Sequence, residues 1–417
     1  MSFGRLSRLL IISIVTITLL GRSSLPPGDP IEQVRAFTRS IEFDYVSWTL
    51  DALWVKLNQV ALGISNYMTD DARSQLVLDY LDLVGSIQND EARLNDIYAD
   101  PNISDPKAAS ATLRQELDSL YNLRAYMQPL AESVLQTQVS TVIADLGLTL
   151  GGQPIPPILY HVTPPPYGLI ISPRNIIRQD ADISILPSLT VYQQAALEGK
   201  VDHALNVSSL VVGIGGVGLY PTMVMQTTDI NWLTETIAHE WVHNFLTLRP
   251  LGISYLSGPE LRTINETTAS IAGKEIGRAV IERYYPEFLP PPPPPTAPPS
   301  ESQNPPATPP AFDYQDEMHL TRITVDDLLA KSKIEDAESY MEARRRVFWE
   351  HGYHIRKINQ AFFAFYGAYA DQPGGAAGED PVGAAVRTLR AKSASLADFL
   401  NRISWISSYD QLKREVQ

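Results

Sequence analysis

The sequence predicts an α+β protein whose sheet-containing core lies between two helical regions. Residues 30–150 and 312–417 carry apolar residues at helical spacing, whereas residues 151–225 contain short β-rich runs bounded by Pro, Gly and polar residues. A mixed sheet followed by helices is an α+β arrangement. With 417 residues, the chain is long enough for about two or three domains and a sizeable buried core.

The composition is globular and excludes several classes of function. Hydrophobic residues make up 44% of the chain and charged residues 19%, which argues against extensive disorder. The formal net charge is −14, and because nucleic-acid binding needs a clustered cationic surface, no nucleic-acid partner is expected. The chain has no cysteine, so disulfides and a cysteine nucleophile are excluded, and any metal must be bound through nitrogen and oxygen.

The N-terminus predicts export. Arg5 and Arg8 precede a largely apolar run at residues 9–20, which is typical of a signal peptide and shorter than the about 20 residues of a membrane span. Because no clear small-residue cleavage site follows, residues 1–29 are interpreted as a signal peptide or an uncleaved membrane anchor. In both cases the rest of the chain crosses the membrane, and it is either secreted or tethered there. The alternative is the buried first helix of a cytosolic protein.

Residues 30–150 are expected to form a helical bundle or stalk. Asp105 followed by Pro106 predicts an N-cap and a first helical residue, and Pro129 is expected to kink or split the helix that contains it. Apolar residues recur on one face of that helix, at Leu113, Leu117, Leu120, Met127, Leu130 and Val134.

Residues 151–285 are expected to form the core. The expected strands are residues 158–162, 168–172, 182–186 and 208–212, with one helix near residues 191–205. The glycine run at residues 213–218 matches the dinucleotide fingerprint GxGxxG, but the residues after it are β-rich instead of helical. The glycines are therefore interpreted as a bend beside the cleft.

Residues 234–246 contain HExxH, the motif on which the functional interpretation depends. His239 and His243 are four residues apart, so on a helix they differ by about 40° in direction and can bind one ion. Zn²⁺ accepts neutral imidazole readily, and Glu240 beside the pair is suited to act as a general base. The helix also has an apolar side to bury, made of Ile237, Val242, Phe245 and Leu246.

A hydrolytic zinc site needs a third protein ligand and an open position. The downstream candidates are Glu260, Glu266 and Glu275. At about 100° per residue, Glu266 and Glu275 point to opposite faces of a helix, so only one of them can face the metal. Small residues share the face of Glu266 and would let its helix approach the HExxH helix closely: Ser270, Gly273 and Gly277. Glu266 is therefore the expected ligand, and Glu275 is the alternative.

The pattern HExxH at residues 239–243 followed by NExxA at residues 265–269 resembles the gluzincin metallopeptidases, the clan of thermolysin-like and aminopeptidase-like enzymes. The resemblance is confined to residues 210–285. It implies a zincin-like core with a zinc ion held by two histidines and Glu266, and with Glu240 as the catalytic base. It also implies that a strand within residues 211–226 binds extended substrate backbone by edge pairing.

Two departures from the gluzincin pattern matter. Where several gluzincins have an acid that orients the first histidine, this chain has Ser270, so Asn265 or Glu235 is the candidate for that role. The Gly-x-Met-x-Asn signature of one aminopeptidase branch is missing, which weakens an expectation of amino-terminal trimming. Gluzincins often stabilise the oxyanion with a Tyr or His from the downstream lobe, and Tyr353 and His354 are the candidates here. The alternative interpretation is that the aromatic residues of this region form part of the core.

Residues 286–311 are interpreted as a Pro-rich linker or surface loop, and residues 312–417 as a C-terminal helical lobe. The Pro-rich segment holds 13 of the 32 prolines, which is typical of a solvated spacer and makes it a candidate for binding a partner.

Together, these features predict an exported zinc metallopeptidase that hydrolyses peptide or protein substrates, with Glu240 as general base. One alternative is a non-catalytic envelope protein that retains a zincin-like module and binds partners. A second is a metal hydrolase that acts on a non-peptide amide.

Overall fold

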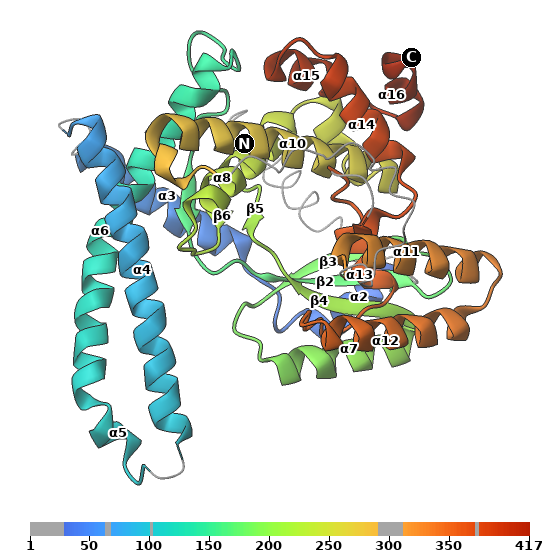
Figure 1. Ribbon diagram of the computed structural model, residues 1–417, viewed down its shortest axis with the longest axis horizontal. Coiled ribbons are helices and arrows are strands. Elements are labelled where there is room, and N and C mark those ends of the chain that lie inside the picture. The colour runs from blue at the N-terminus through green and yellow to red at the C-terminus, as the bar shows by residue number, and fades with distance from the viewer. Residues whose placement is uncertain (1–28, 63–67, 101–102, 291–311, 372–374) are drawn as a thin grey trace, which may run out of the picture.

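The computed structural model describes residues 29–62, 68–100, 103–290, 312–371 and 375–417. The expected signal peptide or anchor and most of the Pro-rich segment lie outside these residues. The α+β prediction is confirmed, since helices surround two small sheets (Figure 1). Within the described ranges, no helix combines the length and the apolar character that crossing a membrane requires.

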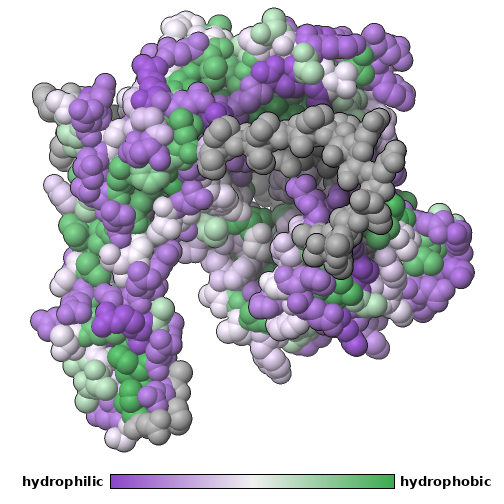
Figure 2. Space-filling model, viewed as in Figure 1, coloured by the Kyte–Doolittle hydropathy of each residue, from purple (hydrophilic) through white to green (hydrophobic). Residues whose placement is uncertain are grey.

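The N-terminal region is helical, as expected, and part of it forms a long arm. Its helices are α2 (Pro30–Thr38), α3 (Tyr45–Leu62), α4 (Asp70–Ala99), α5 (Pro106–Ala109) and α6 (Ala111–Asp145). The antiparallel helices α4 and α6 project from the rest of the molecule (Figures 1 and 2). Asp105 caps α5 by accepting a hydrogen bond from the Ala108 amide, and Pro106 is its first residue. Pro129 lies inside α6, which continues past it, so of the two expected outcomes, a kink or a split, the split does not occur.

The first sheet is antiparallel, with strand order β3-β2-β4. It consists of β2 (Tyr167–Pro173), β3 (Ala181–Ile185) and β4 (Val207–Gly213), which overlap three of the four expected strands. The expected helix is α7 (Val191–Leu205). Alternate residues of β2 enter two different cores: Leu169 packs towards α7, and Ile170 packs towards the C-terminal helices.

The second sheet, in the order β1-β6-β5, lies beside the two longest helices of the core. It consists of β1 (Tyr160–Val162), β5 (Gly216–Val217) and β6 (Thr222–Val224). After it come α8 (Ile230–Leu246), α9 (Pro250–Ile253), α10 (Pro259–Tyr284) and η2 (Pro286–Phe288). Helices α8 and α10 pack at very short range, because a Cβ at Gly277 would lie 2.8 Å from the Glu235 backbone and one at Gly273 would lie 3.0 Å from His239.

The C-terminal region packs against both layers of the core. Its elements are α11 (Tyr314–Ala330), α12 (Ile334–Glu350), α13 (Gln360–Tyr366), η3 (Gly375–Ala377), α14 (Pro381–Lys392), α15 (Leu396–Ile403) and α16 (Tyr409–Val416). Helix α13 covers the face of the first sheet opposite α7, and α14 and α15 pack on α10.

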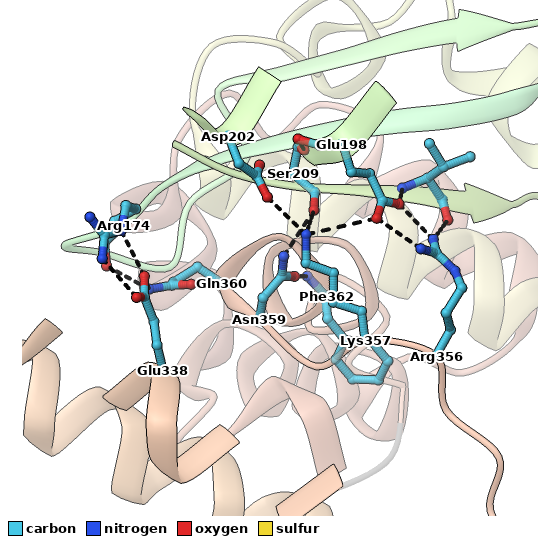
Figure 3. Close-up of polar contacts among 11 residues, drawn as sticks. Arg174, Glu198, Asp202, Ser209, Glu338, Arg356, Lys357, Asn359, Gln360 and Phe362 are labelled. Carbon is cyan, nitrogen blue, oxygen red and sulfur yellow. Dashed lines mark hydrogen bonds and ion pairs between the residues drawn. The ribbon is translucent and has the colours of Figure 1, made fainter. Parts of the chain in front are cut away.

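Ion pairs attach the segment before α13 to the sheet layer (Figure 3). Arg356 makes two hydrogen bonds with the buried carboxylate of Glu198 on α7, at 2.8 Å and 2.6 Å. Lys357 pairs with Asp202 at 2.9 Å and donates to the carbonyl of Ser209 on β4. Bidentate Arg–carboxylate pairs have a fixed geometry, so these contacts determine how the lobe sits over the core.

Candidate metal centre

Helix α8 positions the HExxH residues. Its N-cap is Asp229, which accepts hydrogen bonds from the amides of Asn231 and Trp232 at 2.9 Å and 3.1 Å. The apolar side of α8, including Ile237 and Trp241, is buried in the largest core cluster. The other side of α8 carries His239, Glu240 and His243, and these three residues line a cavity.

His239, His243 and Glu266 converge at one point, as the sequence predicts. The two Nε2 atoms are 3.1 Å apart, and Glu266 Oε2 lies 3.6 Å from His239 Nε2 and 3.5 Å from His243 Nε2. The three ligand atoms lie within 4.8 Å of one another. Glu266 Oε2 is buried and, among the described residues, has no hydrogen-bond partner. A buried carboxylate oxygen without a donor is costly, and a cation held between these three atoms would satisfy it.

The electrostatics of the cluster also favour a cation. Burial lowers the pKa of His243, but Glu266 outweighs burial and raises that pKa to about 9. Burial would raise the pKa of Glu266, but the imidazole of His243, with that of His239, holds it well below its usual range. The carboxylate therefore stays ionised and attracts positive charge. Two nitrogens and one oxygen from His and Glu are a donor set that zinc accepts.

Two neighbouring side chains orient the proposed ligands. Asn265 Oδ1 lies 2.8 Å from His243 Nδ1, so one of the two sequence candidates for this role makes the contact, although with the second histidine. The other candidate, Glu235, lies one turn before His239 on α8. The Tyr255 hydroxyl donates to Glu266 Oε1 at 2.5 Å. No sequence signal points to Tyr255, because no local pattern links a residue after α9 to a carboxylate on α10.

The alternative third ligands lie elsewhere. Glu275 makes a bidentate pair with Arg390 on α14, at 2.7 Å and 2.8 Å. The carboxylate of Glu275 is therefore engaged away from the two histidines. Glu260, in the first turn of α10, is not part of the His–His–Glu group.

Glu240 and two glycines define the cavity beside the cluster. The cavity has a volume of about 340 Å³, and its lining includes Gly216, Gly218 and the three cluster residues. A Cβ at Gly216 would lie 2.7 Å from Glu240 Oε1, and one at Gly218 would lie 2.9 Å from His243 Cβ. The glycine run therefore lets the chain pass close to the cluster. Burial raises the pKa of Glu240, which suits a proton acceptor.

Tyr353 and His354 do not reach this cavity, which corrects their placement as oxyanion donors. The ring of Tyr353 packs on that of Tyr314, with centroids 4.6 Å apart, and His354 packs on Trp349 at 4.1 Å. Their segment is an aromatic surface around the end of α12. The lobe instead brings Tyr369 into the cavity lining, with its ring centroid 6.3 Å from that of His239.

Comparison with known proteins adds no relative. No protein family, curated protein or solved structure matches the chain.

The cavity brings together three kinds of chemical group. It has three converging ligand atoms, a buried carboxylate beside them, and tyrosine hydroxyls that can donate hydrogen bonds. Burial raises the pKa of Tyr369 well above its usual value, and the charge of Glu266 adds to the effect. Tyr369 is therefore protonated at neutral pH and can act as a donor.

Proposed function

We propose that this chain is a zinc-dependent metallopeptidase of the gluzincin type, with a zincin-like core. One observation carries the proposal: the nitrogens of His239 and His243 converge with a buried oxygen of Glu266 that has no hydrogen-bond partner within the described ranges, and all three lie beside a second carboxylate, Glu240. Two imidazoles and one carboxylate are the ligand set of catalytic zinc sites that keep a position open for water or substrate.

His239, His243 and Glu266 would hold the ion. When bound, zinc supplies Lewis-acid polarisation of the scissile carbonyl and lowers the pKa of water. Glu240 cannot join the ligands without leaving its place under Gly216, and its carboxylate lines the same cavity. It therefore takes the proton of the attacking water and passes it to the leaving amine, the role of a general base followed by a general acid.

Strand β5 provides a place for the substrate backbone. It pairs with β6 on one side and, like β1, is an edge strand of the second sheet within the described residues. Its residues Gly216 and Val217 line the cavity. An extended peptide that adds to this edge would pass directly over Glu240, since glycine leaves the backbone groups of β5 accessible.

Tyr369 is the proposed donor to the oxyanion that develops at the scissile carbonyl. It comes from the C-terminal region, faces the cavity across from α8, and is protonated at neutral pH. A neutral hydroxyl held near developing negative charge stabilises the transition state more than the ground state.

Metal analysis together with a cleavage assay tests the proposal. The wild-type protein should bind one zinc ion and cleave a mixed peptide library, and Glu240→Gln should bind zinc without cleaving. Tight zinc binding with no cleavage of any peptide would instead favour the non-catalytic interaction protein. Cleavage of small amides but not peptides would favour a different amide hydrolase.

The proposed enzyme acts outside the cytoplasm. The basic start and the apolar run of the first 20 residues support export, with the chain secreted or tethered by that segment.

A further inference from the structure

Helix α3 carries an exposed apolar stripe. Its members are Val46, Leu50, Trp54 and Leu57, whose exposed fractions are 71%, 63%, 67% and 65%. At about 100° per residue, these four side chains fall within about 80° of one another around the helix. None of them belongs to a hydrophobic cluster of the described residues. Single exposed apolar side chains are ordinary, but a contiguous stripe is typical of a surface that contacts a partner or a membrane.

The other side of α3 is fixed, so the helix cannot turn this stripe into the core. Ala52 is buried, and Lys56 pairs with the buried carboxylate of Glu132 on α6 at 2.5 Å. At the start of the helix, the hydroxyl of Tyr45 donates to Ser184 Oγ on β3 at 2.5 Å. Turning α3 would break the buried ion pair, which is strongly destabilising. The stripe is therefore exposed because of how the rest of the helix is held.

The stripe has the composition of a segment that lies in a membrane interface. Helix α3 has two charged residues: Lys56, which is buried, and Asp51, which lies about 60° beyond Trp54 around the helix. Tryptophan is enriched where a membrane meets water, because its ring is apolar and its N–H can still donate a hydrogen bond. No helix of the described ranges can cross a membrane, so α3 would lie along the surface instead.

The start of the chain favours a membrane as the occupant of this surface. The apolar run at residues 9–20, interpreted above as a signal peptide or anchor, is separated from Asp29 by residues 21–28. Such a connection spans at most about 30 Å. From Asp29 onward, α2 packs on β3 and Glu42 forms a β-bridge with Ile185, and α3 follows directly. An inserted N-terminal run would therefore keep α3 near the bilayer, and tethering of this kind makes a weak contact effective.

We propose that the stripe of α3 lies in the interface of the membrane into which the N-terminal segment inserts. The inference goes beyond the proposed peptidase activity and rests on the proposed export of the chain. The stripe begins directly after Tyr45, which lines the metal cavity. Membrane contact through α3 would therefore place that cavity beside the lipid surface.

Quenching of tryptophan fluorescence by brominated lipid tests the contact directly. The full chain is reconstituted in phosphatidylcholine vesicles with brominated acyl chains, which quench an indole only at short range. Residues 1–28 contain no tryptophan, so their insertion alone gives no quenching. We expect quenching in the wild type and its loss in Trp54→Phe. Trp405→Phe is the matched control and should keep the quenching, because Trp405 is as exposed as Trp54, at 65% against 67%.

A second pair of variants tests the apolar character of the stripe. Leu50→Asp should also lose the quenching, because a carboxylate in the stripe would have to enter the apolar layer. Ser119→Asp, on the exposed surface of α6, adds the same charge and should keep the quenching. All the substituted side chains are exposed, so each variant should keep the thermal midpoint of the wild type.

The proposal is overturned if the wild-type protein does not associate with the vesicles, or if it does so while Trp54→Phe leaves its quenching unchanged. Full quenching in Leu50→Asp would also overturn it. These results leave the proposed peptidase intact if the protein cleaves peptides. Quenching through Trp54 without any cleavage would sustain the membrane contact and refute the peptidase.

Discussion

A single methyl group at Gly216 should impair catalysis without unfolding the protein. In Gly216→Ala the new Cβ would lie 2.7 Å from Glu240 Oε1 and 2.8 Å from Glu240 Cγ, against an ordinary contact of at least 3.4 Å. The carboxylate must therefore move by about 0.7 Å, and a misplacement of roughly 1 Å costs on the order of 100-fold in rate. We expect kcat/KM to fall by about 100-fold, or about 2.7 kcal/mol of transition-state stabilisation.

The folded state should tolerate this change. The group that must move is the flexible end of a side chain, and Gly216 does not have a positive φ. Zinc content and thermal midpoint should stay close to those of the wild type, because Glu240 is not among the proposed ligands. Gly213→Ala is the matched control, since a Cβ there meets no atom within 4 Å, and it should keep full activity. Wild-type activity in Gly216→Ala would refute the role of Glu240, and loss of zinc would mean that the methyl group acts on the ligands.

Three further predictions concern the metal, the oxyanion and the fold. Glu266→Gln should lose tightly bound zinc on metal analysis, whereas Glu275→Gln should retain it; the opposite result would exchange their roles. Tyr369→Phe should lower kcat by about 100-fold with little change in KM, since a transition-state donor is worth about 2.7–4 kcal/mol; an effect on KM alone would assign it to substrate binding. Glu132 is buried on α6 and pairs with Lys56 at 2.5 Å. Glu132→Gln should lower the free energy of unfolding, measured in denaturant, by about 3–5 kcal/mol, because it leaves Lys56 buried without its carboxylate partner. Burial raises the pKa of Glu132, but the charge of Lys56 lowers that pKa by more, so the net shift is downward. The pair therefore stabilises the fold above the ordinary carboxyl pKa of about 4.3, and this stabilisation is lost as the pH falls below that value. The unfolding midpoint of the wild type should therefore drop more steeply between neutral pH and pH of about 3 than that of Glu132→Gln; equal slopes would contradict the argument.

Features that depend on neighbours in the sequence were predictable. The four-residue spacing of His239 and His243 decides their common face once a helix forms, and the apolar residues on the other side of α8 favour that helix. The short β-rich runs and the helix near residues 191–205 were recognisable for the same reason. The choice of Glu266 over Glu275 also followed from helical periodicity and small residues on one face, and the structure places only Glu266 beside the histidines.

Contacts between distant segments were not predictable from these patterns. Pro129 does not divide α6, because proline removes one backbone hydrogen bond and the helix stays packed along α4 on both sides of it. Tyr353 and His354 were chosen for their residue types, yet the turn after α12 directs them to other aromatic side chains, and the chain returns to the cavity only at Tyr369.

The sequence by itself therefore determined the residue types of the His–His–Glu group, the spacing of the two histidines and the helix that presents them, since these depend on residues within a few turns of one another. Only the tertiary structure decided which tyrosines enter the cavity, and that Asn265 and Tyr255 contact two of the three proposed ligands, His243 and Glu266. The physical reason is that these contacts join segments far apart in the chain, whose approach is set by the packing of the whole core and not by any local periodicity.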